Sequence, residues 1–68
     1  MRHYIATVPD GLGWDEVVSL AYDSGATITW TYIDVRDVLR VWLEVSDDRA
    51  DDLVDGCGRL SMTLEERP

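Results

Sequence analysis

The sequence predicts an α+β domain in which a four-stranded antiparallel sheet carries both of its helices on one face. Three observations lead to this prediction. Four segments alternate apolar and polar residues, as half-buried strands do, and two others repeat apolar residues every three or four positions, as amphipathic helices do. The segments follow one another in the order strand, helix, strand, strand, helix, strand, which makes two split β-α-β units. Right-handed crossovers leave few other arrangements for that order.

The first half of the chain supplies a strand and a helix. Residues 3–8 (HYIATV) alternate and end at Pro9, which predicts the first strand. Residues 10–13 (DGLG) are typical of a turn. Residues 14–24 (WDEVVSLAYDS) carry apolar residues at helical spacing, with acidic residues in the first turn, where the helix dipole favours negative charge. Gly25 then ends the predicted helix.

Two strands in the middle of the chain form a predicted hairpin. Residues 27–35 (TITWTYIDV) and 38–45 (VLRVWLEV) are rich in β-branched and aromatic residues and alternate strictly. The link between them is short, although it holds neither the Gly nor the Asn of a primed turn. Residues 60–65 (LSMTLE) supply the last strand. The whole chain, residues 1–68, is therefore predicted to form a single ferredoxin-like domain.

The stretch from Val45 to Leu60 (VSDDRADDLVDGCGRL) predicts an acidic helix. Its apolar residues recur at i, i+3, i+4 and i+7, as in a stripe that faces a core; they are Ala50, Leu53, Val54 and Cys57. Ser46 or Asp47 is expected to cap its start, and Gly56 or Gly58 to end it. The outward face is expected to carry five carboxylates, which we call the acidic row: Asp47, Asp48, Asp51, Asp52 and Asp55.

Alternation also predicts the two faces of the sheet. The helix-covered face is expected to hold Tyr4, Ala6, Val8, Ile28, Trp30, Tyr32, Leu39, Val41, Leu43, Val45, Leu60, Met62 and Leu64. The open face, turned away from the helices, is expected to show Ile5, Thr7, Thr29, Thr31, Ile33, Arg40, Trp42, Glu44, Ser61 and Thr63. Within it, Ile5, Ile33, Arg40 and Trp42 form a candidate patch for self-association or a partner. Scattered surface apolar residues that need no function are the alternative.

Length and composition bound the kind of protein. A chain of 68 residues, 46% of them hydrophobic, allows one small core, and pairing into a homodimer would add to its stability. One cysteine excludes an internal disulfide and fits a reducing compartment. The sequence has no apolar run long enough to span a membrane and no signal-peptide pattern, so a cytoplasmic location is expected.

The residues that carry catalytic or metal chemistry are scattered. The single histidine, His3, and the single cysteine, Cys57, fall on different elements without further partners. The glycine turn at residues 11–13 follows a strand and opens a helix, but Asp15 and Glu16 occupy the place where a phosphate would bind. The aspartates lack the spacing of a calcium loop. The sequence therefore predicts no enzyme, no metal site and no cofactor.

Residues 8–28 (VPDGLGWDEVVSLAYDSGATI) resemble the start of an ACT domain. In that family a strand leads through a Gly-containing turn to a helix, and a small-Gly-x-x-Ile pattern enters the second strand. The matching residues are Val17, Val18, Leu20, Ala21, Gly25, Ala26 and Ile28. The resemblance implies side-by-side dimers that bind a small ligand, often an amino acid, near the first turn. Asp10, Gly11 and Gly13 would then form the ligand turn.

Charge is the strongest pointer to function. Fourteen acidic residues against six arginines give a net charge of −8, which repels nucleic acid and anionic membranes and attracts basic partners. Such partners include proteins that themselves bind nucleic acid. Solubility alone is the other explanation of the acidity. In size and charge the chain resembles phage-encoded inhibitors, including anti-CRISPR proteins.

Three functions remain open from the sequence. The first is a small acidic, non-enzymatic binding protein whose acidic row mimics a nucleic-acid backbone and occupies the basic surface of a partner protein. The second is an ACT-like dimerising module that binds a small ligand such as an amino acid. The third is a structural or assembly subunit that associates through its open face or its edge strands.

Overall fold

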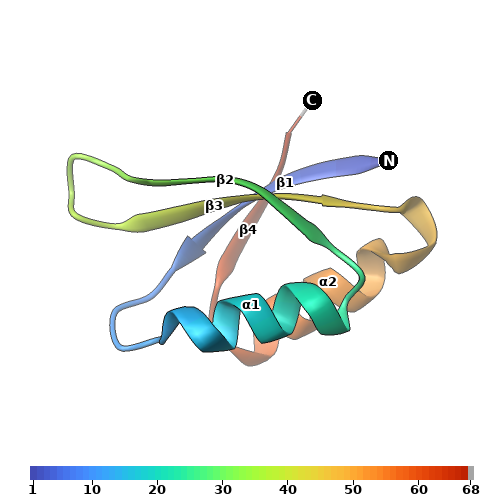
Figure 1. Ribbon diagram of the computed structural model, residues 1–68, viewed down its shortest axis with the longest axis horizontal. Helices are drawn as coiled ribbons and strands as arrows, with labels where there is room; N and C mark the ends of the chain where they lie inside the picture. The colour runs from blue at the N-terminus through green and yellow to red at the C-terminus, as the bar shows by residue number, and fades with distance from the viewer. Residues whose placement is uncertain (68) are drawn as a thin grey trace.

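The structure is a computed structural model that describes residues 1–67. Its elements follow the predicted order, and both helices lie on one side of the sheet (Figure 1). Their bounds are β1 Arg2–Val8, α1 Trp14–Asp23, β2 Thr27–Ile33, β3 Leu39–Val45, the 3-10 turn η1 Asp47–Arg49, α2 Ala50–Arg59 and β4 Thr63–Arg67. The predicted ferredoxin-like α+β fold is confirmed. Neither ten-residue helix of the described chain is long and apolar enough to cross a membrane.

The sheet has the order β2-β3-β1-β4, and every neighbouring pair is antiparallel. On the two central strands, Tyr4 lies opposite Leu43 and Ala6 opposite Val41. These side chains are buried beneath the helices, as the alternation predicts. The core consists of Tyr4, Ala6, Val8, Val17, Ala21, Val41, Leu43, Val45, Ala50, Leu53, Cys57 and Met62.

A register shift in β2 overturns part of the prediction for the two faces. Ile28 lies opposite Leu43, but the next paired residue, Trp30, lies opposite Trp42, so Thr29 is an extra residue. Such a bulge moves every later side chain of the strand to the other face of the sheet. The Thr29 hydroxyl donates to the Trp42 carbonyl oxygen over 3.4 Å within the bulge.

Beyond the bulge, the expected faces of β2 are reversed. Trp30 and Tyr32, expected under the helices, lie instead on the open face, and Trp30 is 60% exposed. Thr31 and Ile33, expected on the open face, pair with the inward-facing Val41 and Leu39. Because β2 is an edge strand, Ile33 stays 65% exposed although it points to the helix side.

The acidic stretch and the last strand begin later than predicted. The chain first forms η1, so the α-helix starts at Ala50. Ser61 adopts a positive φ of 60° and turns the chain, so β4 starts at Thr63 rather than at Leu60. The acidic row therefore spans two kinds of helix, with two aspartates in η1 and three in α2.

The two helices approach each other closely at Gly56, which lies inside α2 rather than at its end. A Cβ at this position would collide with Leu20 of α1. Gly56 and Leu53 are buried, whereas Val54, expected to face the core, is 49% exposed. Ala50, Leu53 and Cys57 of the predicted stripe are buried, and Gly56 takes the place of Val54 where α2 meets α1.

Cys57 lies in the core beneath the sheet and is 1% exposed. Burial raises the pKa of its thiol to about 11, because the thiolate would lose its hydration. Cys57 is therefore a small apolar residue of the core at neutral pH.

The glycine contact gives a test of the fold. Gly56→Ala should lower the free energy of unfolding by ~1–3 kcal/mol, because the added methyl overpacks the helix interface. Gly58→Ala is the matched control on the same helix, since an added Cβ there meets nothing within 4 Å. It should raise stability by ~0.5–1 kcal/mol, because alanine loses less backbone entropy than glycine. Urea denaturation measures both, and equal effects of the two changes would contradict this packing.

Candidate interaction surfaces

The acidic row lies on the surface, as predicted. All five aspartates are exposed, whereas Leu53 and Cys57 of the same segment point into the core. Asp48 stays ionised to lower pH than an ordinary aspartate, because a hydrogen bond from the Ser46 side chain lowers its pKa.

Arginines of the same segment neutralise part of the row. Arg49 Nε lies 2.8 Å from Asp52 Oδ2, and Arg59 Nη2 lies 2.7 Å from Asp55 Oδ2. Exposed pairs like these add little stability, but they compensate the charge locally. Asp48 and Asp51 have no cationic partner among residues 1–67.

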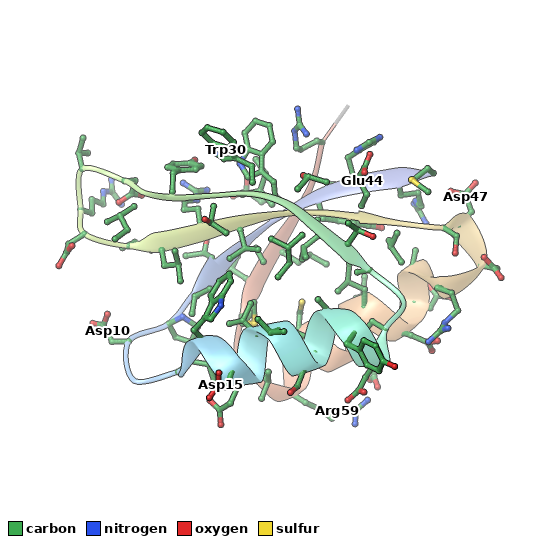
Figure 2. All side chains as sticks on the ribbon, viewed as in Figure 1. Asp10, Asp15, Trp30, Glu44, Asp47 and Arg59 are labelled. Atoms are coloured by element: carbon green, nitrogen blue, oxygen red, sulfur yellow. The ribbon has the colours of Figure 1, made fainter. Side chains whose placement is uncertain are left out.

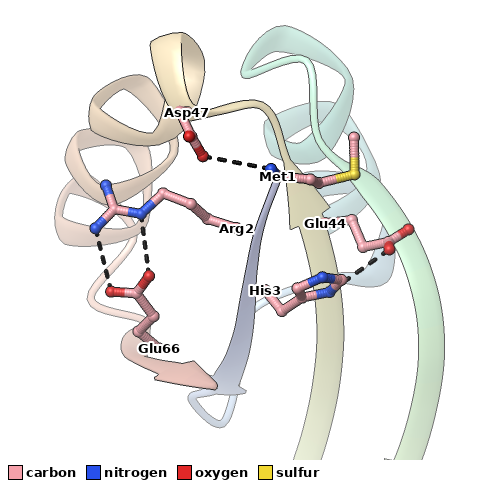
Figure 3. A network of polar contacts seen from close by, with 6 residues as sticks. All are labelled: Met1, Arg2, His3, Glu44, Asp47 and Glu66. Atoms are coloured by element: carbon pink, nitrogen blue, oxygen red, sulfur yellow. Dashed lines mark hydrogen bonds and ion pairs between the residues drawn. The ribbon is translucent and has the colours of Figure 1, made fainter. Parts of the chain in front are cut away.

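The remaining aspartate of the row belongs to a set of ion pairs at one end of the sheet (Figure 3). Asp47 Oδ1 lies 3.5 Å from the Met1 amino nitrogen. The Arg2 side chain donates to both carboxylate oxygens of Glu66, over 3.0 and 3.2 Å. These contacts anchor η1 to β1 and join β1 to β4.

Helix α1 adds carboxylates that do not belong to the acidic row. Asp15, Glu16 and Asp23 lie on its exposed surface and face a groove of about 570 Å³ between α1 and α2. The groove is lined by Asp15, Glu16, Ser19, Leu20, Asp23, Ser24, Asp52, Gly56, Arg59 and Leu60. Figure 2 shows Asp15 and Arg59 on the helical side of the molecule. The polar spacing of Asp15, Ser19 and Asp23, at i, i+4 and i+8, is the sequence signal for this wall.

The helix dipole of α1 stabilises one of these carboxylates and destabilises another. Asp15 lies in the first turn of α1, where the helix dipole favours an anion, and Asp23 is the last residue of α1, where the dipole disfavours one. Arg49, the last residue of η1, reaches across to α1 and donates from Nη2 to the Asp23 carbonyl oxygen over 2.8 Å. The negative charge of Asp23 is therefore a local cost to the fold, which Arg49 partly offsets.

The open face is aromatic rather than acidic. Trp30, Trp42 and Ile5 lie in one row across three strands, and Tyr32 and Arg40 lie side by side in the next. Figure 2 shows Trp30 on the side of the sheet away from the helices. Ile5, Arg40 and Trp42 of the predicted patch come together there, whereas Ile33 lies on the other face. The bulge in β2 thus replaces Ile33 by two larger aromatic side chains.

Arginines cover part of this aromatic row. The Arg67 guanidinium lies 3.8 Å from the centroid of the Trp42 ring, in a cation–π contact. Arg40 lies 3.7 Å from Asp34 and 3.9 Å from Glu65, measured between nitrogen and carboxylate oxygen. Arg40 Nε and Trp42 Nε1 are buried without a hydrogen-bond partner among residues 1–67. The centre of the open face is therefore packed tightly by side chains of its own strands.

Formal charge separates the two sides of the molecule. On the open face the strands carry two arginines, Arg40 and Arg67, and two glutamates, Glu44 and Glu65, so the formal charge of that face is zero. The other four arginines and twelve carboxylates therefore carry the whole net charge of −8. They lie on the helices, on the turns and on the helix side of the sheet. The open face is thus suited to short-range apolar contact and the helical side to long-range electrostatic attraction.

The other candidate residues lie outside the groove. Asp10, Gly11 and Gly13 are exposed, the turn takes a positive φ of 87° at Gly11, and none of the three lines the groove. His3 lies on the open face, 3.5 Å from Glu44, whereas Cys57 lies beneath the sheet. Residues 1–67 contain no cluster of side chains arranged to hold a metal ion.

No protein-family model and no curated protein matches the sequence. The fold and its surfaces define the chain as a small ferredoxin-like α+β domain with an acidic helical side and an aromatic open face.

The two ends of α1 supply a test of these electrostatics. Asp23→Asn should raise the free energy of unfolding by ~0.3–1 kcal/mol, because it removes an anion from the negative end of the helix dipole. Asp15→Asn is the same chemical change at the positive end and should lower it by a similar amount. Urea denaturation at low salt measures the difference, which should shrink at high salt. A difference of zero at low salt would contradict the account.

Proposed function

We propose that the protein is a small, non-enzymatic binding protein that occupies a basic surface of a partner protein, such as the nucleic-acid-binding surface that the partner uses. One observation carries the proposal: the whole net charge lies away from the open face, with both helices presenting carboxylates on one side. The fold keeps those carboxylates outward because the opposite faces of the helices are buried. This is the mode of action implied by the likeness in size and charge to phage-encoded inhibitors such as anti-CRISPR proteins.

Elementary electrostatics supports this use. Residues on a helix advance by about 1.5 Å each, so the carboxylates of α2 form a closely spaced line of charge. A line of this kind attracts a basic surface from beyond contact distance and speeds association. The attraction weakens as salt shortens the Debye length from about 10 Å at 0.1 M toward 3 Å at 1 M. Binding to the partner should therefore be fast and sensitive to salt.

The decisive test removes charge from the helical side. A variant that combines Asp48→Asn, Asp51→Asn, Asp52→Asn and Asp55→Asn should lose capture of a basic partner from the source organism, because the attracting line of charge is lost. Capture is measured as partner recovered per mole of immobilised protein at low and moderate salt. Circular dichroism verifies that the variant still folds.

The matched control removes the same number of charges elsewhere. It carries Asp10→Asn, Asp37→Asn, Glu44→Gln and Glu65→Gln, which lie in turns and on the open face. This variant should retain most of the capture. Undiminished capture by the helical-side variant at both salt concentrations would refute the proposal.

A second candidate function is self-assembly through the open face, and the bulge in β2 favours it. The register places Trp30 beside Trp42 on a face without net charge, so two copies can meet there without the repulsion of their acidic sides. Aromatic side chains contribute large contact areas to interfaces. The face spans four strands spaced about 4.8 Å apart, an extent suited to a small interface.

Sedimentation analysis tests this second candidate. The protein should form a dimer in a concentration-dependent manner, and Trp30→Ser should weaken that dimer by about tenfold or more, as loss of an aromatic anchor does. Tyr22→Ser is the control, because Tyr22 is an aromatic residue of α1 that is 84% exposed. A monomer at every concentration, or equal effects of the two changes, would exclude assembly through the open face.

A further inference from the structure

We propose that the groove between α1 and α2 binds the side chain of an arginine of the partner protein. This inference rests on the proposed function and names the chemical group that the helical side recognises. Four features of the groove support the proposal. They are a wall of carboxylates, an apolar floor, an unpaired serine hydroxyl, and an arginine of the chain itself that already bridges the same two helices.

The groove has the lining that an arginine side chain requires. Asp15, Glu16 and Asp23 line it from α1, and Asp52 lines it from α2. Leu20 and Leu60 supply an apolar surface between them, against which the methylene groups of an arginine can pack. Its volume of about 570 Å³ falls within the range of ~300–1,000 Å³ that is usual for ligand sites.

A guanidinium group of the chain already joins two residues that line the groove. Arg49 Nε contacts Asp52 Oδ2 over 2.8 Å, and Arg49 Nη2 donates to the Asp23 carbonyl oxygen over 2.8 Å. One arginine thus joins a carboxylate of α2 to the last residue of α1. The spacing of the helices therefore suits a planar group with several donors.

An unpaired hydroxyl that lines the groove points to a ligand independently of the carboxylates. Ser24 is only 3% exposed, yet it lines the groove. Its hydroxyl makes none of the side-chain hydrogen bonds found among residues 1–67, and it lies 3.7 Å from the position of a Cβ added at Gly56. A guanidinium N–H that enters the groove would give this unpaired hydroxyl oxygen a hydrogen-bond donor.

Arginine fits this lining better than lysine. A guanidinium offers five donors in one plane and is weakly hydrated, so it can lie on an apolar floor and bond to groups on both walls. An ammonium group has a tighter hydration shell and fewer directions in which to donate. Arg59, which pairs with Asp55, is the one cationic residue that lines the groove. Its positive charge repels a cationic ligand that binds close to it.

The test uses a blocked peptide of four arginines separated by glycines, titrated into the intact protein by calorimetry at about 20 mM salt, where screening is weak. Asp15→Asn with Asp23→Asn should weaken binding by about tenfold or more, because the groove loses two of its carboxylates. The control, Asp48→Asn with Asp51→Asn, removes the same charge outside the groove and should change the affinity by less than about threefold.

Further variants and peptides distinguish binding in the groove from general electrostatic attraction to the acidic surface. Ser24→Ala changes no charge and should weaken binding severalfold, because the hydroxyl acceptor in the groove is lost. Peptides with lysine or with neutral citrulline in place of arginine should bind more weakly than the arginine peptide. Arg59→Gln should strengthen binding, because it removes the opposing cation.

The outcomes are distinguishable from failure of the proposed function. Equal weakening by the two charge-matched pairs, or equal binding of the lysine peptide, would overturn the arginine groove while leaving an acidic binding surface in place. Absence of any peptide binding would also overturn it. Partner capture that survives loss of Asp48, Asp51, Asp52 and Asp55 would instead overturn the proposed function itself.

Discussion

Burial of one face of the sheet beneath both helices is the constraint on which the rest of the structure depends. Leu53 and Val41 are fully buried, and Val17 is 1% exposed, so sheet and helices share one continuous core. In a chain of 68 residues with fourteen carboxylates, that core leaves no interior room for charge. The carboxylates must lie outside, and because both helices cover the same face, they gather on one side. The opposite face of the sheet stays aromatic and balanced in charge.

The order of elements and the core of the central strands were predictable, because alternation and helical periodicity are strong on β1, β3 and α1. The reversal of Trp30 was not, because a bulge that inserts one residue leaves the alternating pattern of β2 intact. The exposure of Val54 was also missed, since the helix instead turns Gly56 toward α1 to allow close approach. The hairpin lacked a glycine signal because Asp37, at a φ of 62°, takes the left-handed conformation itself.

The acidic face was predictable from the spacing of the aspartates, but its free charge was not. Which carboxylates are compensated depends on Arg49 and Arg59, whose pairing follows from side-chain geometry. Asp23 contributes its carboxylate to the groove only because α1 packs beside α2, and this tertiary contact does not follow from the local sequence pattern. Asp23 is also the last residue of α1, where its negative charge opposes the helix dipole and destabilises the helix. A fold that keeps a charge at such a place beside a groove is consistent with use of that charge in binding.

The central claim is that the helical side, and the groove within it, recognises cationic side chains. Mapping of amide ¹H–¹⁵N shifts in the intact protein during titration with the arginine peptide tests it most directly. The account predicts saturable shifts at Leu20, Ser24 and Gly56, on both walls of the groove, with the indole signals of Trp30 and Trp42 unmoved. Shifts centred on the open face, or spread evenly over all acidic residues, would contradict it.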